Sequence, residues 1–185
     1  MMGRCLQARR LTQREGLPAA WGALYLSAFP AEERRDLRWQ SLALADADFF
    51  CTELRAAEVF VGLLSYWKPQ NGAFLYVEHF ALCPERRGQG YGGSALRLLA
   101  AQNAPLLLEI EPPADDLTRR RLRFYERNGF RLLSHEHRQL PYQPHYPAVP
   151  LCLMAKGEVD DALIGQLEAY LRQRVMRWRD PACYP

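Results

Sequence analysis

The chain has 185 residues, of which 49% are hydrophobic and 24% charged, a balance typical of a folded globular protein rather than a disordered one. A formal net charge of +3 is too small to indicate a nucleic-acid partner, and no apolar run approaches the roughly 20 residues that a membrane helix needs. The first residues turn polar too early for a signal peptide, so we expect a cytoplasmic protein that binds neither nucleic acid nor membrane.

The first half of the chain predicts two helices and then a run of antiparallel strands. The helices follow from apolar positions three and four apart, and the strands from β-rich runs bounded by turn residues. In chain order we expect a strand at residues 4–10, helices at 18–28 and 32–44, and strands at 48–55, 58–67 and 73–83.

The second half alternates helices and strands. We expect a helix at residues 94–101, a strand at 106–111, a helix from about 116 to 128, strands at 130–139 and 151–156, and a last helix at 160–179. Asp115 or Asp116 suits the cap of the middle helix, and Gly129 suits its end. Only the connection from Leu82 to Leu106 resembles a parallel crossover. The pattern therefore predicts an α+β fold with a mixed, mostly antiparallel sheet flanked by helices.

We expect residues 1–157 to form a single domain and residues 158–185 to form a C-terminal helix packed on it. The five cysteines are scattered, and no two of them have the close spacing of a zinc or redox motif. We therefore expect free thiols and no bound metal.

Between a strand and a helix lies the segment Arg86-Arg87-Gly88-Gln89-Gly90-Tyr91-Gly92-Gly93. A glycine-rich turn before a helix is suited to hold phosphate, because the first amides of the helix are free and the glycines let an anion come close. The two arginines add positive charge. A tight turn with no ligand is the simpler alternative.

The same segment also matches G-x-G-x-x-G, with Glu109 about 20 residues on, as in dinucleotide-binding folds. Three observations count against that reading. The residues 84–87 separate the strand from the first glycine, the segment follows antiparallel strands, and too little chain follows it to build two mononucleotide halves.

The chain resembles the GNAT acetyltransferase superfamily in two motifs. Arg87-x-x-Gly90-x-Gly92 is similar to the phosphate loop of the family, and residues 124–130, Phe-Tyr-Glu-Arg-Asn-Gly-Phe, are similar to its second motif. The close resemblance covers residues 73–131. The ends of the chain resemble one uncharacterised bacterial branch of the family.

The resemblance implies a GNAT-like fold and acetyl-CoA as the acyl donor. Pantetheine would bond the backbone of the strand at Phe80 and Leu82 like an added strand, and the amides of the glycine loop would hold the pyrophosphate. The cofactor-binding residues it implies are Phe80, Leu82, Arg87, Gly88, Gln89, Gly90, Tyr91, Gly92 and Gly93. Thr118 and Arg121 stand where the family often has Asn and Ala, which leaves the usual side-chain contact to the coenzyme arm in doubt. The arginine cluster at residues 119–123 would face either solvent or the 3′-phosphate of the coenzyme.

The resemblance also implies amine acetylation by direct attack in a ternary complex. Glu78 would be the base, directly or through water, and Tyr125 the general acid; the alternatives are a salt-bridged carboxylate and a packed tyrosine. His79 should point to the opposite sheet face if the strand is regular. The oxyanion donor would be the N–H of Leu82.

The acceptor is expected to be a small-molecule or peptide amine. Carboxylates on adjoining strands would favour a cationic group. The candidate substrate residues are Phe29, Glu109, Glu111, Tyr142 and Tyr146. A coenzyme-binding module with weak or no turnover is the alternative function, and the C-terminal helix with Trp178 leaves room for a homodimer.

Overall fold

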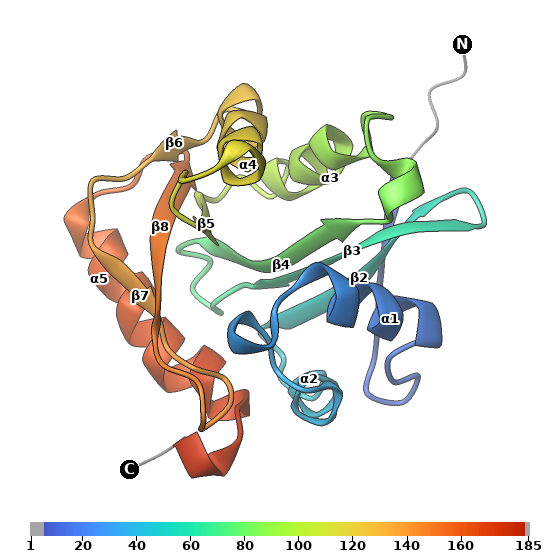
Figure 1. Cartoon of the computed structure of the whole chain (residues 1–185), viewed down its shortest axis with the longest axis horizontal. Coiled ribbons are helices and arrows are strands. Elements are labelled where there is room, and N and C mark those ends of the chain that lie inside the picture. The colour runs from blue at the N-terminus through green and yellow to red at the C-terminus, as the bar shows by residue number, and fades with distance from the viewer. Residues whose placement is uncertain (1–5, 184–185) are drawn as a thin grey trace.

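The computed structural model describes residues 6–183, and an eight-stranded sheet runs through them (Figure 1). Its order is β1-β2-β3-β4-β5-β8-β6, and β7 also pairs with β8. The strands are β1 (Leu6–Arg10), β2 (Phe49–Ala56), β3 (Val59–Trp67), β4 (Leu75–Leu82), β5 (Leu106–Ile110), β6 (Arg131–Leu132), β7 (His137–Gln139) and β8 (Val149–Lys156). Of these pairings only β4–β5 is parallel. The predicted mixed, mostly antiparallel sheet is confirmed.

Five α-helices flank the sheet: α1 (Ala19–Ala28), α2 (Leu37–Ala43), α3 (Tyr91–Ala100), α4 (Asp116–Arg127) and α5 (Asp161–Tyr170). Short helical turns occur at Ala31–Glu33, Pro84–Arg86 and Pro181–Cys183, and α5 continues as a π-helical turn at Leu171–Val175 and a 3₁₀ turn at Met176–Trp178. Asp115 caps α4 as predicted, and Gly129 after it has a φ of 85°. No helix within residues 6–183 is long and apolar enough to cross a membrane.

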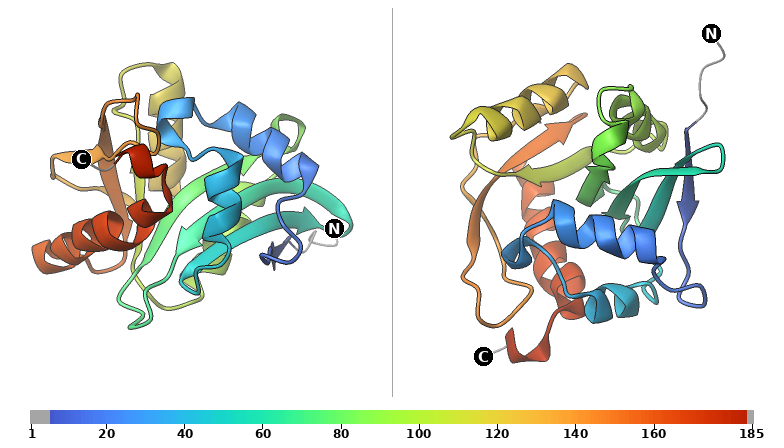
Figure 2. Two further views of the ribbon diagram at one scale, coloured as in Figure 1. Left: turned by 90° about the horizontal axis from the view of Figure 1, so that it is seen from below. Right: turned by 45° about the vertical axis from the view of Figure 1, so that its right-hand side comes forward.

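The helices form two layers on opposite faces of the sheet (Figures 1 and 2). The helices α1 and α2 cover one face, and α3 and α4 cover the other. Each layer has its own core cluster. Trp21, Trp67 and Tyr76 belong to the first cluster, and Leu96 and Leu108 belong to the second. Because the sheet is covered on both faces, most of β2, β3 and β4 is apolar.

The C-terminal helix packs on the first core cluster. Leu167, Leu171 and Val175 are buried there with residues of α1 and the sheet, such as Trp21. Trp178 is half buried, and its Nε1 donates to Asp46 at 2.8 Å. The helix is thus part of the same core, and the expected boundary at residue 157 remains a prediction.

Some predicted elements differ from the structure. The helix expected at residues 32–44 is a 3₁₀ turn and the shorter α2, because Asp36 caps α2 by accepting from the N–H of Trp39 at 3.0 Å. The strand expected at residues 130–139 is divided into β6 and β7. The helix after the glycines begins at Tyr91 rather than at residue 94. Residues 4 and 5 of the expected first strand lie outside the described residues.

The central strand β4 carries a β-bulge. Ser65 of β3 lies opposite His79, but the next residue, Tyr66, lies opposite Val77, so Glu78 is an extra residue in β4. A bulge reverses the alternation of side chains from that point onward. Glu78 and His79 therefore face the same side of the sheet, toward α1.

Candidate active site

A cleft opens where β4 and β5 separate. Their parallel ladder has three pairs, and the last of them joins Val77 to Leu108. Both strands continue beyond this pair, so the sheet divides there. A cavity of about 750 Å³ occupies the division, and its walls come from residues 77–82 of β4, the glycine loop, the end of β5, α4 and the end of α1.

The second half of β4 presents main-chain groups to this cleft. The N–H of Cys83 donates to the C=O of Val61 on β3 at 3.0 Å, so Cys83 faces β3. Alternate residues of an antiparallel strand face opposite neighbours, so the peptide groups of Phe80 and Leu82 face the cleft. Phe80 and Leu82 both line it. The strand edge predicted to bind an extended ligand is therefore accessible.

The glycine loop ends at the N-terminus of α3, beside the cleft. Gly88 and Gly90 have φ values of 73° and 83°, which a glycine adopts without strain, and Gly90 caps the helix. The first amides of a helix lack intrahelical partners, so the helix start can bind an anion. Arg87 lines the cleft, and its Nε donates to the C=O of Leu82 at 3.3 Å.

The other two glycines serve the packing of α3 against α4. A Cβ on Gly92 would lie 2.9 Å from Cζ of Phe124, and a Cβ on Gly93 would lie 3.0 Å from Oδ1 of Asn128. By contrast, a Cβ on Gly88 or Gly90 would meet no atom within 4 Å. The segment thus divides into a turn that needs positive φ and a helix start that needs close packing.

Two side chains that we assigned to the coenzyme face elsewhere. Gln89 turns back to donate to the C=O of Glu85 at 2.9 Å, and it does not line the cleft. Tyr91 is 4% exposed and belongs to the core between α3 and the sheet. The side chains of Gln89 and Tyr91 therefore do not line the cleft, and these residues could contact a ligand there only through their backbone amides.

Tyr125 lies on α4 and lines the cleft, as the second motif predicts. It packs edge-on against Phe124 and Phe130, with ring centroids at 5.1 and 5.5 Å. Burial raises the pKa of Tyr125 to about 12, although the charge of Arg121 lowers it. The phenol therefore keeps its proton at neutral pH and can donate a hydrogen bond into the cleft.

Glu78 is held in a buried network instead of projecting freely into the cleft. Its Oε1 lies 2.6 Å from Nη1 of Arg35 and accepts from the hydroxyl of Tyr142 at 2.7 Å, and its Oε2 accepts from Nε1 of Trp67 at 3.0 Å. Burial alone would raise the pKa of Glu78, but the charge of Arg35 and hydrogen bonds from His79 and Tyr142 lower it to about 2. These contacts fit the salt-bridged alternative and speak against a direct base role.

His79 lies beside Glu78, because the bulge brings both side chains to one face. The prediction that they point to opposite faces is wrong. Nδ1 of His79 is 3.7 Å from Oε2 of Glu78 and 3.4 Å from Oγ of Ser65, while Nε2 is 3.2 Å from the C=O of Glu33. The ring also packs edge-on against Phe29. His79 is therefore a packed, hydrogen-bonded histidine.

A carboxylate that the sequence did not single out lies at the rim of the cleft. Glu33 is in the turn between α1 and α2, and it lines the cleft with Phe29. Burial raises the pKa of Glu33, Arg121 lowers it, and the negative charges of Glu32 and Glu109 raise it further. No periodicity marks such a residue, because its position depends on a loop docking against β4.

The two expected carboxylates of β5 also reach the cleft. Glu109 accepts from the hydroxyl of Tyr76 at 2.5 Å and is bonded to Nε2 of His137. Glu111 forms an ion pair with Arg121 of α4. As expected, β4 and β5 adjoin, and the cleft has acidic groups from β5 and from the α1–α2 turn.

The two tyrosines of the late loop are not among the residues that line the cleft. Tyr142 is 1% exposed and supports Glu78 from the core instead. Tyr146 is half buried and packs against His145, with ring centroids at 4.3 Å. The aromatic residue of the expected acceptor group that does line the cleft is Phe29.

Part of the arginine cluster on α4 faces the cleft. Arg120 and Arg121 line it, whereas Arg119 pairs with Asp116 on the helix surface. Thr118 completes a capping box with Asp115 and so serves the helix rather than a ligand. The cluster therefore divides between solvent and cleft.

The sequence profile of the acetyltransferase (GNAT) domain matches residues 45–132. A solved structure from Bacteroides thetaiotaomicron, assigned to the GNAT acetyltransferases, has a TM-score of 0.81 and 28% identity over 92% of this chain and 98% of that chain. Residues 45–132, just under half of the chain, thus match the acetyltransferase (GNAT) domain, and the fold of the whole chain is similar to that of a GNAT structure. The resemblance drawn from the two motifs is confirmed.

Two further proteins are similar to the chain. YjbC of Bacillus subtilis, named as an acetyltransferase, is 41% identical over 61 residues, which is 32% of this chain and 32% of that protein. The match thus spans about a third of this curated relative. A GNAT acetyltransferase from Elizabethkingia anophelis, solved with acetyl-CoA bound, has a TM-score of 0.58 and 16% identity over 83% of this chain and 98% of that chain, which shows a shared fold.

Proposed function

We propose that this protein transfers the acetyl group of acetyl-CoA to a primary amine while both substrates are bound. The observation that carries the proposal is the open edge of β4, which runs along the cleft from Val77 to the glycine loop, with Tyr125 lining the same cleft. An extended thioester arm, an anionic end and a proton donor can be placed along this one path. The acetyl-CoA bound to the Elizabethkingia anophelis relative supports the choice of donor.

The chain offers the coenzyme two kinds of contact. The peptide groups of Phe80 and Leu82 can pair with the amide groups of the pantetheine arm, as a neighbouring strand would. The amides at the start of α3 and the side chain of Arg87 suit the pyrophosphate, and the open space around Gly88 and Gly90 lets it approach the backbone. The peptide groups are dipoles fixed by the fold and need little rearrangement.

Transfer requires two proton movements. The amine nitrogen must lose a proton before it attacks the thioester carbon, and the thiolate that leaves when the carbon–sulfur bond breaks must gain one. Tyr125 is the candidate donor to the thiolate. With a pKa of about 12 it is a weak acid, so we expect its proton to move as the thiolate departs rather than beforehand.

We assign the role of base to Glu33 rather than to Glu78. Glu78 has a pKa of about 2 and its oxygens are occupied, so it is a poor acceptor of the amine proton. Glu33 faces the cleft with a raised pKa, which is closer to what a base at neutral pH requires. Glu78 then becomes a positioning residue that anchors β4 through Arg35.

The acceptor is proposed to be a cationic amine. Glu33 and Glu109 bring negative charge to the cleft, while Glu111 is neutralised by Arg121. A carboxylate-lined cleft attracts a protonated amine and raises its local concentration. Phe29 adds an apolar wall that suits the carbon chain of such a substrate.

Two measurements test the proposal. Titration calorimetry with acetyl-CoA should show binding, and a thiol-release assay over polyamines, aminoglycosides, amino acids and peptides should show turnover with at least one cationic amine. Acetyl-CoA binding without turnover on any acceptor would instead support the coenzyme-binding module. Absence of binding at millimolar acetyl-CoA would reject both.

A further inference from the structure

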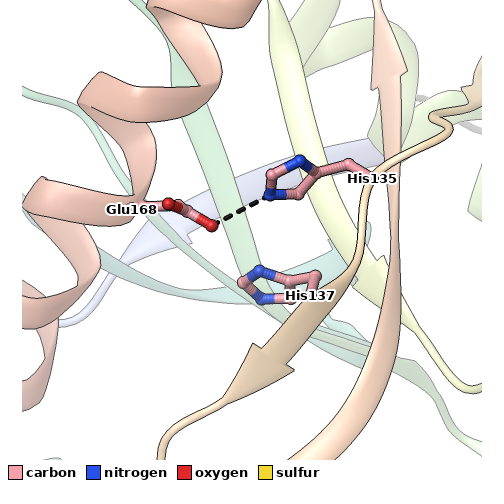
Figure 3. Close-up of side chains that lie close together, drawn as sticks. All are labelled: His135, His137 and Glu168. Carbon is pink, nitrogen blue, oxygen red and sulfur yellow. Dashed lines mark hydrogen bonds and ion pairs between the residues drawn. The ribbon is translucent and has the colours of Figure 1, made fainter.

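A cluster of two histidines and a glutamate lies behind the acceptor cleft. His135 precedes β7, His137 begins it, and Glu168 projects from α5 toward both rings (Figure 3). They line a second cavity of about 640 Å³, which shares Glu109 with the cleft. Nothing in the proposed acetyl transfer uses these three side chains.

The three side chains converge closely enough to share one ion. One ligand atom from each lies within 4.8 Å of the other two. Nε2 of His135 is 2.9 Å from Oε1 of Glu168. A tetrahedral zinc ion with bonds of about 2.0–2.1 Å places its ligand atoms roughly 3.3–3.5 Å apart, so the widest pair needs to close by up to about 1.5 Å.

The surroundings allow that closure. The side chains of His135 and Glu168 are 31% and 30% exposed, so each can move toward an ion that enters from the cavity. His137 is 4% exposed and is fixed by its bond from Nε2 to Glu109, which leaves Nδ1 of that ring for a ligand. A carboxylate that holds the far nitrogen of a ligand histidine is the usual support of a metal-bound imidazole.

We propose that His135, His137 and Glu168 form a binding site for a divalent transition-metal ion of the zinc type, with water as the fourth ligand. Imidazole nitrogens and one carboxylate suit zinc and its neighbours, whereas magnesium and calcium prefer oxygen ligands. Two arginines line the cavity: Arg138 is exposed, and Nη2 of Arg172 lies 3.4 Å from Oε2 of Glu168. The side chain of Arg172 is 63% exposed and can turn to solvent.

Glu109 connects the proposed metal site to the cleft. Glu109 orients His137 on one side and lines the acceptor cleft on the other. An ion bound to His137 would therefore restrict the carboxylate that faces the amine. The metal site has no part in the proposed transferase chemistry, and metal binding can be measured without an activity assay.

Cobalt(II) is the probe for the ligand set, and zinc(II) the probe for affinity. The full chain, freed of metal by a chelator, is dialysed against each ion and the bound metal is counted. We expect one ion per chain and the visible cobalt spectrum of a four-coordinate nitrogen–oxygen site. Sulfur-to-cobalt charge-transfer bands would mean that cysteines bind the metal instead and would overturn the proposal. So would the absence of stoichiometric binding, or equal binding of magnesium.

The variants His135→Gln, His137→Gln and Glu168→Gln should each abolish the cobalt spectrum. The matched control is His145→Gln, since His145 is exposed and outside the cluster. Glu109→Gln should weaken zinc binding by about 10–100-fold, the usual effect of losing a supporting carboxylate. Circular dichroism checks that each variant is folded. Unchanged zinc affinity in folded His135→Gln and Glu168→Gln would reject the site.

Discussion

Arg35 and Glu78 form a buried ion pair whose Nη1–Oε1 distance is 2.6 Å, and their side chains are 0% and 1% exposed. The same guanidinium donates from Nε to the C=O of Trp178 at 2.8 Å and from Nη2 to the C=O of Val175 at 3.0 Å. One side chain thus joins the α1–α2 connection, the central strand β4 and the end of the C-terminal helix. The pair therefore fixes the β4 wall of the cleft to the rest of the fold.

Arg35→Met should destabilise the protein by about 3–5 kcal/mol, because it leaves the buried charge of Glu78 without its partner. Urea unfolding measures the loss. The control is Arg119→Met, whose pair with Asp116 has side chains 48% and 97% exposed and should cost less than about 1 kcal/mol. Equal losses in the free energy of unfolding for the two variants would show that the buried pair stabilises the protein no more than the exposed pair.

The pair should also set the response to acid. The pKa of Glu78 is lowered from 4.5 to about 2, so its contribution is complete above the unfolded-state value and is lost as the pH falls through the folded-state value. We expect the melting temperature to fall most steeply between pH 4.5 and pH 2. Glu78→Gln should be less stable at neutral pH and show a shallower fall in this window. Parallel profiles for both proteins would contradict the assignment.

The sequence signals for β4, the glycine loop and the helix of Tyr125 are local, so the placement of these elements could be predicted. A strand ended by Pro84, a glycine turn and an amphipathic helix follow one another in the chain, and so does the helix that carries Tyr125. Each element is fixed by its own periodicity and caps. The strand, the loop and Tyr125 accordingly meet at one cleft in the structure.

The proposed acceptor side could be predicted only in part, because much of it depends on contacts between distant residues. Arg35 looks like one more surface arginine, yet it is fully buried against Glu78. The bulge at Glu78 arises from pairing with β3, and a strand pattern with period two does not show it. Glu33 reaches the cleft only because Asp36 starts a new helix, so that residues 31–33 form a separate turn.

Glu33→Gln should lower kcat/KM by roughly 100-fold or more if Glu33 accepts the amine proton. The base acts when deprotonated, so the rate should fall as the pH drops through the raised pKa of Glu33. The variant should lose that acidic limb of the pH–rate profile. Glu32→Gln is the control, since Glu32 is adjacent but does not line the cleft. Similar small effects of both variants would remove Glu33 from the mechanism.

Tyr125→Phe should lower kcat by roughly 10–1000-fold with little change in acetyl-CoA affinity, because the ring remains and only the proton donor is lost. The pKa of about 12 means that no loss of wild-type rate below about pH 11 should come from this phenol. Steady-state kinetics and calorimetry separate the two quantities. Tyr146→Phe, away from the cleft, should match the wild type. An unchanged kcat in Tyr125→Phe would exclude the acid role.

Gly92 packs closely against Phe124 of α4, and this contact can be tested by substitution. Gly92→Ala should weaken both folding and acetyl-CoA binding, because its Cβ would lie 2.9 Å from Cζ of Phe124 and would push α4 away from the helix start that we propose to bind the coenzyme. We expect a loss of about 1–3 kcal/mol in urea unfolding, as is usual for overpacking. Gly165→Ala is the matched control. Gly165 lies within α5 with no atom within 4 Å of an added Cβ, so this change should stabilise the protein by up to about 1 kcal/mol. If Gly92→Ala were as stable as the wild type and bound acetyl-CoA equally well, the contact between α3 and α4 would not position the loop.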